Sequence, residues 1–124
     1  CGTTASMCGI EKALSEGAQM GAPDLEQAIR MDVMLHTYMF MQSGIPVIYG
    51  GDEIGRLNDY SYKENPNKAE DSRYIHRGAM DWKAVSQIDD ETTVAGKLFS
   101  QLDRLEKIRK NEKVFMAEAD TWTI

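Results

Sequence analysis

The chain has 124 residues, of which 42% are apolar and 27% are charged, and its formal net charge is −6. These values are typical of one soluble globular domain, and the negative charge argues against nucleic acid and anionic membrane surfaces as partners. No apolar run approaches the ~20 residues that a membrane-spanning helix needs.

The two cysteines, Cys1 and Cys8, are too few and too close together for a disulfide framework. We therefore expect a reducing compartment and a cytoplasmic protein. The first residue is not methionine and no signal segment precedes it, so the presence of a signal peptide on a longer parent gene stays open.

The first element expected is a short helix that is capped by Thr3 or Thr4 and ends before Gly17. Its apolar stripe consists of Met7, Ile10 and Leu14. Residues 15–23 are small and polar, which is typical of a connection.

A second and longer helix is predicted over residues 25–42. Pro23 suits the first helical position, and Asp24 and Glu26 complement the positive end of the helix dipole. The apolar residues are Leu25, Ile29, Met31, Val33, Met34, Leu35, Tyr38, Met39, Phe40 and Met41. Because they cover almost the whole circumference, we expect a helix buried on most sides, with methionines that pack a core rather than bind a ligand. Gly44 supplies the stop.

Residues 45–49 form a short apolar run bounded by glycines, which predicts a strand buried on both faces. A long loop without apolar periodicity follows, and loops of that length are usually functional. Its polar and aromatic residues are Asp52, Glu53, Asp59, Tyr60, Tyr62, Lys63, Asp71, Arg73, Tyr74, His76, Arg77 and Trp82. Polar groups past the carboxyl end of a buried strand form ligand sites in α/β folds, and acids, arginines and aromatic rings together suit a sugar.

The last long element is an amphipathic helix from about residue 92 to residue 111. Its apolar stripe is Val94, Leu98, Leu102, Leu105 and Ile108. Residues 121–124 alternate like the start of a new strand.

These elements amount to three helices and one buried strand, and a lone strand leaves its amides and carbonyls without partners. We therefore expect the neighbouring strands to lie on another part of a longer chain or on another molecule. The sequence is interpreted as a fragment, and it contains no internal repeat or low-complexity segment.

The sequence resembles the α-amylase family (glycoside hydrolase family 13), and within it most resembles the amylosucrases. Residues 44–53, Gly-Ile-Pro-Val-Ile-Tyr-Gly-Gly-Asp-Glu, match the family pattern for the last barrel strand and the start of its loop. Residues 57–59, Leu-Asn-Asp, and 68–77, Lys-Ala-Glu-Asp-Ser-Arg-Tyr-Ile-His-Arg, are similar to the amylosucrase version of that loop. Residues 2–6 and 9–11 are similar to the segment that enters the seventh helix.

The resemblance implies an α/β fold, with residues 1–116 as the C-terminal quarter of a (β/α)₈ (TIM) catalytic barrel: helix seven, strand eight, loop eight and helix eight. Residues 117–124 would begin a β-rich C-terminal domain. Such a barrel takes ~250 residues, so the isolated piece cannot close one and should be mostly helical and self-associating. Members are retaining enzymes with an Asp nucleophile, a Glu acid/base and a second Asp, all on earlier strands. The resemblance therefore implies no catalytic residue in this chain. No cofactor is expected, and Asp52, Glu53 and Asp59 lack the compact spacing of metal ligands.

Four residues are predicted to contact the sugar substrate: Arg73, Arg77, Asp52 and Glu53. The resemblance implies that Arg73 pairs with an Asp from the first half of the barrel at the closed end of the sugar pocket. From the sequence alone, an ion pair that only orders the loop is an equal alternative. Adjacent carboxylates such as Asp52 and Glu53 seldom act on one bond, so they are expected to form the wall of the site or orient the loop. His76 is interpreted as a hydrogen-bonding scaffold residue.

The parent is therefore expected to transfer glucose from sucrose to an α-1,4-glucan, while the fragment itself is inactive. A hydrolase of the same family, an α-amylase or α-glucosidase, is an alternative, because the loops that choose between water and sugar lie elsewhere. An alternative of another class is a non-catalytic helical interaction module, whose apolar faces would bind a partner.

Overall fold

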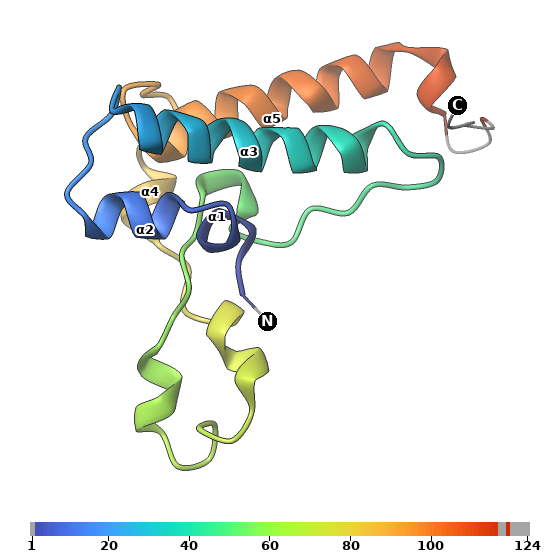
Figure 1. Cartoon of the computed structure of the whole chain (residues 1–124). Coiled ribbons are helices and arrows are strands. Elements are labelled where there is room, and N and C mark those ends of the chain that lie inside the picture. Colours follow the sequence, from blue (N-terminus) through green and yellow to red (C-terminus); the bar gives the residue numbers. More distant parts are fainter. Residues whose placement is uncertain (1, 117–118, 120–124) are drawn as a thin grey trace.

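The computed structural model describes residues 2–116 and residue 119, and all regular elements in this part of the chain are helical (Figure 1). The α-helices are α1 (Thr4–Met7), α2 (Ile10–Ser15), α3 (Pro23–Phe40), α4 (Trp82–Val85) and α5 (Val94–Asn111). Short 3₁₀ helices lie at η1 (Asp52–Ile54), η2 (Ser61–Glu64), η3 (Ser72–His76) and η4 (Lys113–Phe115). The expectation of a mostly helical chain is confirmed.

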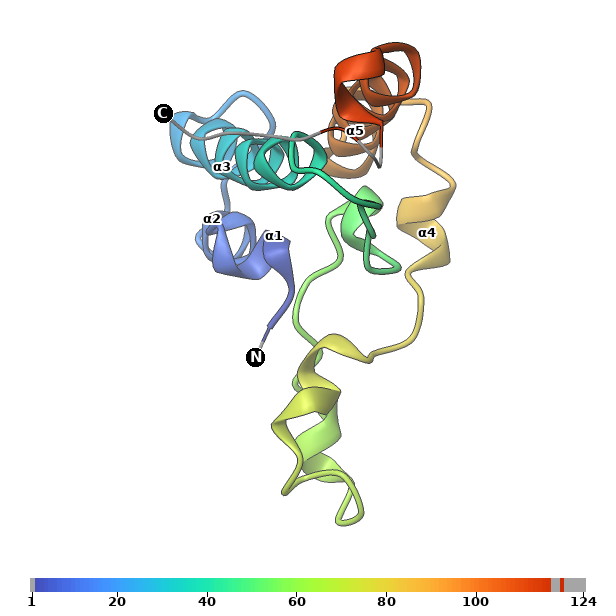
Figure 2. The same ribbon diagram turned by 90° about the vertical axis from the view of Figure 1, so that its right-hand side faces the viewer.

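The two long helices, α3 and α5, lie side by side and run in the same direction (Figures 1 and 2). Both helices were predicted, but the expectation that the first is buried on most sides is wrong, because Met31 and Met34 are 47% and 53% exposed. The starts of both helices follow local chemistry. Pro23 occupies the first turn of α3, and the hydroxyl oxygen of Thr93 caps α5 by accepting a hydrogen bond of 3.0 Å from the Gly96 amide. The main core cluster is small and joins α1, α2, α3 and α5: Ala5, Ile10, Ala13, Leu25, Ala28, Ile29 and Leu98.

The first helical segment is broken into α1 and α2, so the prediction of one continuous helix is wrong. Gly9 separates the two with a φ of 99°, in the left-handed region that glycine adopts most easily. Because of this break, the three residues of the expected apolar stripe no longer share one buried face. Ile10 is fully buried, whereas Met7 is 73% exposed and Leu14 is at the surface.

Residues 45–49 run back beneath the two long helices but form no strand in the described part of the chain (Figure 1). The prediction of a strand buried on both faces is therefore wrong for this chain by itself. Ile45 and Val47 are 83% and 75% exposed, while Pro46 and Ile48 lie half-buried against the C-terminal half of α5. The physical reason is that no second strand is present among the described residues to satisfy the backbone.

Arg109 of α5 fixes the point where α3 ends and this extended segment begins. Its guanidinium donates hydrogen bonds to the carbonyl oxygens of Phe40, Gln42 (2.8 Å) and Gly44. The last carbonyls of a helix have no partner within the helix, and a cation there also complements the helix dipole. Arg109 therefore ties the end of α3 to its neighbour.

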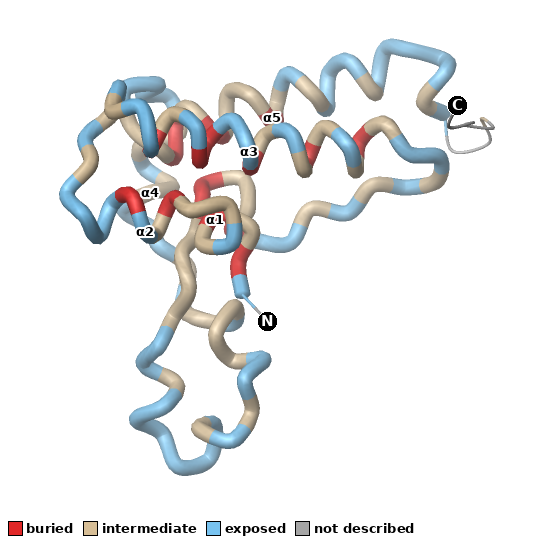
Figure 3. Tube along the Cα trace, in the orientation of Figure 1, coloured by how far each residue is buried: buried red, intermediate tan, exposed pale blue. Residues whose placement is uncertain are grey.

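Residues 59–78 project away from the helices as a long loop that carries η2 and η3 (Figure 1). None of its residues is fully buried, whereas the buried residues gather in the helices and around η1 (Figure 3). The strand predicted at residues 121–124, and the domain start predicted at 117–124, lie outside the described residues apart from Ala119.

We expect the isolated chain to self-associate through the exposed face of residues 45–49. At ~25 cal/mol per Å², a few hundred Å² of exposed apolar surface is comparable with the ~5–15 kcal/mol that stabilises a typical domain, and an unpaired extended backbone can add to a copy of itself. Sedimentation velocity should show concentration-dependent species, and the pair Ile45→Lys and Val47→Lys should shift them toward monomer. Met7→Lys, at another exposed apolar residue, should not. A compact monomer at all concentrations would contradict this.

Candidate functional site

The candidate site lies where the extended segment ends, at the turn that contains η1. Ile54 anchors this turn with only 4% of its surface exposed, and η1 packs against α5. Gly55, with a φ of 67°, allows the close approach, because a Cβ there would lie 2.6 Å from the Leu98 side chain. The turn is thus held firmly from one side, and Asp52 projects from the other.

Asp52 lines a hollow of about 260 Å³ together with Thr4, Tyr49 and His76. The rings of Tyr49 and His76 meet edge to face, with their centroids 5.4 Å apart. The Arg56 guanidinium lies 5.8 Å from the centroid of the Tyr49 ring. Three residues that sequence reasoning took from one strand and its loop, Tyr49, Asp52 and His76, therefore come together in space.

Behind Asp52 lies a buried group of charges on α3. Asp32 and His36 are 0% and 4% exposed. The Nδ1 atom of His36 lies 2.9 Å from Oδ1 of Asp32 and 3.0 Å from its carbonyl oxygen, and Nε2 lies 3.7 Å from Oδ2 of Asp52. The carboxylate oxygens of Asp32 accept no hydrogen bond of regular geometry from the described residues. Its charge is therefore balanced by the His36 ring beside it.

This arrangement favours a charged imidazole. The carboxylate of Asp32, and then that of Asp52, raise the pKa of His36 to about 10, against the opposing effect of burial. The nearby Cys8 thiol is affected in the same sense, because burial and the charge of Asp32 raise its pKa to about 11. At neutral pH the imidazole of His36 is therefore protonated, and the Cys8 thiol is not ionised.

The other residues predicted as substrate contacts lie apart from Asp52. Glu53 turns back on its own loop, where its carboxylate accepts a hydrogen bond of 2.8 Å from the Gly51 amide. Arg73 and Arg77 lie on the projecting loop. Arg73 pairs with Asp71 at 2.8 Å, with 64% of its side chain exposed, and Arg77 stands over the Tyr74 ring. The structure brings neither arginine to Asp52, and their contact with a sugar stays a prediction.

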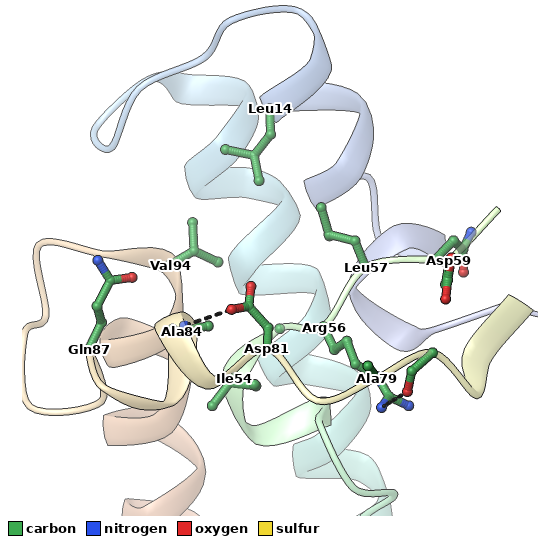
Figure 4. Close-up of a pocket in the computed structure, with 14 residues that line it drawn as sticks. Leu14, Ile54, Arg56, Leu57, Asp59, Ala79, Asp81, Ala84, Gln87 and Val94 are labelled. Carbon is green, nitrogen blue, oxygen red and sulfur yellow. Dashed lines mark hydrogen bonds between the residues drawn. The ribbon is translucent and has the colours of Figure 1, made fainter. Parts of the chain in front are cut away.

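A larger cavity, of about 580 Å³, lies between the two segments that lead into and out of the projecting loop (Figure 4). Its apolar lining includes Leu14, Ile54, Leu57, Val94 and Ala95. The polar groups at its rim hold the chain in place: Arg56 donates to the Gly78 carbonyl at 3.2 Å, and Asp81 accepts from the Ala84 amide at 3.0 Å. This cavity is large enough for a small ligand, but Arg56 and Asp81 at its rim already bind backbone groups of the protein.

In the part of the chain that the structure describes, no group of three His, Cys, Asp or Glu side chains could hold a metal ion. None of the helices described is long and apolar enough to cross a membrane.

Sequence reasoning missed Asp32 and His36, although a signal was present. The helix was predicted from its apolar spacing, and the buried face of α3 runs through Leu25, Ile29 and Phe40. Asp32 and His36 occupy the same face, four residues apart. Ionisable residues at such positions are seldom buried unless they are paired, so their spacing predicts a buried ion pair.

No protein-family model matches this chain.

We expect the stability of the chain to fall as the pH rises above neutral, because of His36. Its folded-state pKa, about 10, lies above the ordinary value of 6.5, so its contribution is complete below about pH 6.5 and is lost as the pH rises through about 10. The free energy of unfolding in urea should fall by roughly 1 kcal/mol per pH unit between about pH 7 and 8.5, below the ordinary titration of a thiol.

The control for this prediction is His36→Gln, which should cost roughly 3–5 kcal/mol at neutral pH, because Asp32 is left buried and unpaired. It should also flatten the dependence on pH over the same interval. A wild-type chain whose stability is constant between about pH 7 and 8.5 would show that His36 is not charged in the folded state.

Proposed function

We propose that the chain is the C-terminal quarter of the (β/α)₈ barrel of an α-amylase family enzyme of the amylosucrase type. The whole enzyme would move a glucosyl unit from sucrose to an α-1,4-glucan through a covalent glucosyl-enzyme intermediate. The three family carboxylates would come from the earlier strands, so residues 1–124 would supply substrate contacts and structural support.

One arrangement carries this proposal: two parallel helices joined by an extended segment that runs antiparallel to both (Figure 1). Helices of the same direction that pack side by side need a chain that returns between them. In α/β folds that return is a strand, and α3, residues 45–49 and α5 have the order and directions of one such unit. A helical hairpin, in contrast, would make neighbouring helices antiparallel.

The exposure pattern along residues 45–49 supports the same proposal. A barrel strand turns alternate side chains toward the surrounding helices and toward the barrel interior. Here Pro46 and Ile48 are partly buried and line a groove with Phe40 of α3 and the end of α5, while Ile45, Val47 and Tyr49 are the exposed side chains. Those three side chains are large and apolar, as an interior layer of a barrel requires.

The position of the polar site is a further support. Active sites of (β/α)₈ barrels lie at the carboxyl ends of the strands. Asp52 and His76 gather at the carboxyl end of residues 45–49, with the long aromatic loop beside them. A family hydrolase remains an alternative. The non-catalytic helical module is disfavoured, because a helix pair has no need of a returning extended segment and a polar loop at its end.

The first test is direct. Residues 1–124 alone should release no glucose or fructose from sucrose, maltose or starch, because the proposal assigns all three carboxylates to other strands. The full reading frame that contains them should encode an Asp, a Glu and a second Asp at strand ends and should consume sucrose. Sugar release by the isolated chain above a buffer blank, or a full reading frame without those carboxylates, would refute the proposal.

The second test concerns Arg73 in the full-length enzyme. Its planar guanidinium can hold a carboxylate and still donate to sugar hydroxyls, and a buried partner left without it costs roughly 3–5 kcal/mol. Arg73→Ala should therefore lower kcat/KM on sucrose by about a hundredfold or more.

Arg104→Ala, an exposed residue on α5, is the matched control for Arg73→Ala and should change kcat/KM little. In the isolated chain Arg73 pairs with Asp71, so its role at a sugar requires the loop to meet the rest of the barrel. Equal and small effects of the two substitutions would make Arg73 a residue that only orders the loop.

A further inference from the structure

We propose that Asp32 and His36 are positioning residues that fix the Asp52 carboxylate at the edge of the hollow lined by Thr4, Tyr49 and His76. Asp32 and His36 lie on α3, and Asp52 lies in the η1 turn, 16 residues after His36. This inference stands on the geometry of the isolated chain and does not depend on the proposed sugar chemistry.

The first step is the order in which the charges lie. Asp32 is fully buried and contacts Nδ1 of His36, and this leaves Nε2 directed toward Asp52. A histidine whose one nitrogen is held by a carboxylate has a fixed ring orientation, and its other nitrogen then acts at a defined place. Asp52, with 14% of its side chain exposed, is the member that reaches the hollow.

The second step is the balance of charge. A carboxylate buried as fully as that of Asp32 is costly without a cation beside it. The titratable groups that face His36 are Asp32 from its own helix and Asp52 from the η1 turn, and Cys8, at the end of α1, lies near Asp32. One imidazolium thus serves two carboxylates, and the attraction to Asp52 is what holds the turn toward α3.

The third step is what Asp52 can then do. The hydroxyl of Thr4 donates to the same Oδ2 atom at 3.5 Å, a long contact that leaves the rest of the carboxylate available. A carboxylate that is already held in one place accepts hydrogen bonds from a ligand without a further loss of side-chain entropy. The hollow therefore presents a preset acceptor, and Asp32 and His36 act through it rather than on a ligand themselves.

The protonation of His36 is tested by ¹⁵N NMR of the imidazole rings. The chain has two histidines, so His76→Gln assigns the spectrum. We expect both ring nitrogens of His36 to be protonated at about pH 8, and Asp32→Asn to move its midpoint toward about 6.5. Asp71→Asn, which removes a carboxylate from the exposed pair with Arg73, is the matched control and should leave His36 unchanged.

Amide hydrogen exchange in the η1 turn tests whether that charge positions Asp52. The Gly55 amide donates to the Asp52 carbonyl at 3.0 Å, so its protection reports on the turn. At about pH 8, Asp32→Asn should speed its exchange about tenfold relative to the intrinsic rate, while amides in the middle of α5 stay unchanged. At about pH 5, where His36 of the variant is charged again, the protection should return.

The return at low pH separates positioning by charge from a merely structural role of Asp32. Asp52→Asn is the second variant, because a side chain that is 14% exposed can be replaced with less damage to the fold than the fully buried Asp32. It should lower the midpoint of His36 by less than Asp32→Asn does. A midpoint near 6.5 in the wild-type chain, equal exchange of Asp32→Asn at both pH values, or a larger effect of Asp52→Asn would each overturn the inference. None of these outcomes bears on whether the full-length enzyme acts on sucrose.

Discussion

The contact between α3 and α5 determines where everything else in the chain lies. Leu25 and Ile29 of one helix and Leu98 of the other are fully buried or nearly so, and the small helices and the η1 turn pack around them. Because the two helices are parallel, the chain between them must return along their length, and Arg109 holds the point of return by binding three carbonyls. The site at Asp52 is placed by that return, where the η1 turn meets His36 in the C-terminal half of α3.

The same constraint explains which expectations from the sequence were right. The long helices were predictable because their apolar spacing is regular and their caps are local, as at Pro23 and Thr93. The extended residues 45–49 were predictable as a segment but not as a strand. Strand formation requires a partner backbone, which is a property of neighbours rather than of the five residues. Gly9 breaks the first helix because its backbone is in the left-handed region, which the apolar spacing of the sequence does not reveal.

The sequence predicted the part of the candidate site that lies in residues 49–76 but not the part that lies on α3. Tyr49 ends the segment that was predicted as a strand, Asp52 and His76 lie in the loop after it, and the three side chains meet. Asp32 and His36 come from a helix that was judged by its apolar residues alone. A hydropathy pattern averages over positions, so it does not reveal two ionisable residues on a mainly apolar helix face. A buried polar side chain nevertheless needs a hydrogen-bonding or charged partner. This requirement predicts that Asp32 and His36 pair with each other.

A buried charge group in so small a core also needs a reason. Replacing an ion pair by apolar residues of similar volume is often neutral or stabilising, so the burial of Asp32 and His36 is not explained by stability alone. Unlike leucines, a carboxylate and an imidazole make directional contacts, because each contact has a defined donor and acceptor. Here the direction runs from the interior of α3 to Asp52 at the surface hollow. The energetic cost of burying the pair is thus best understood as the cost of holding one surface carboxylate in place.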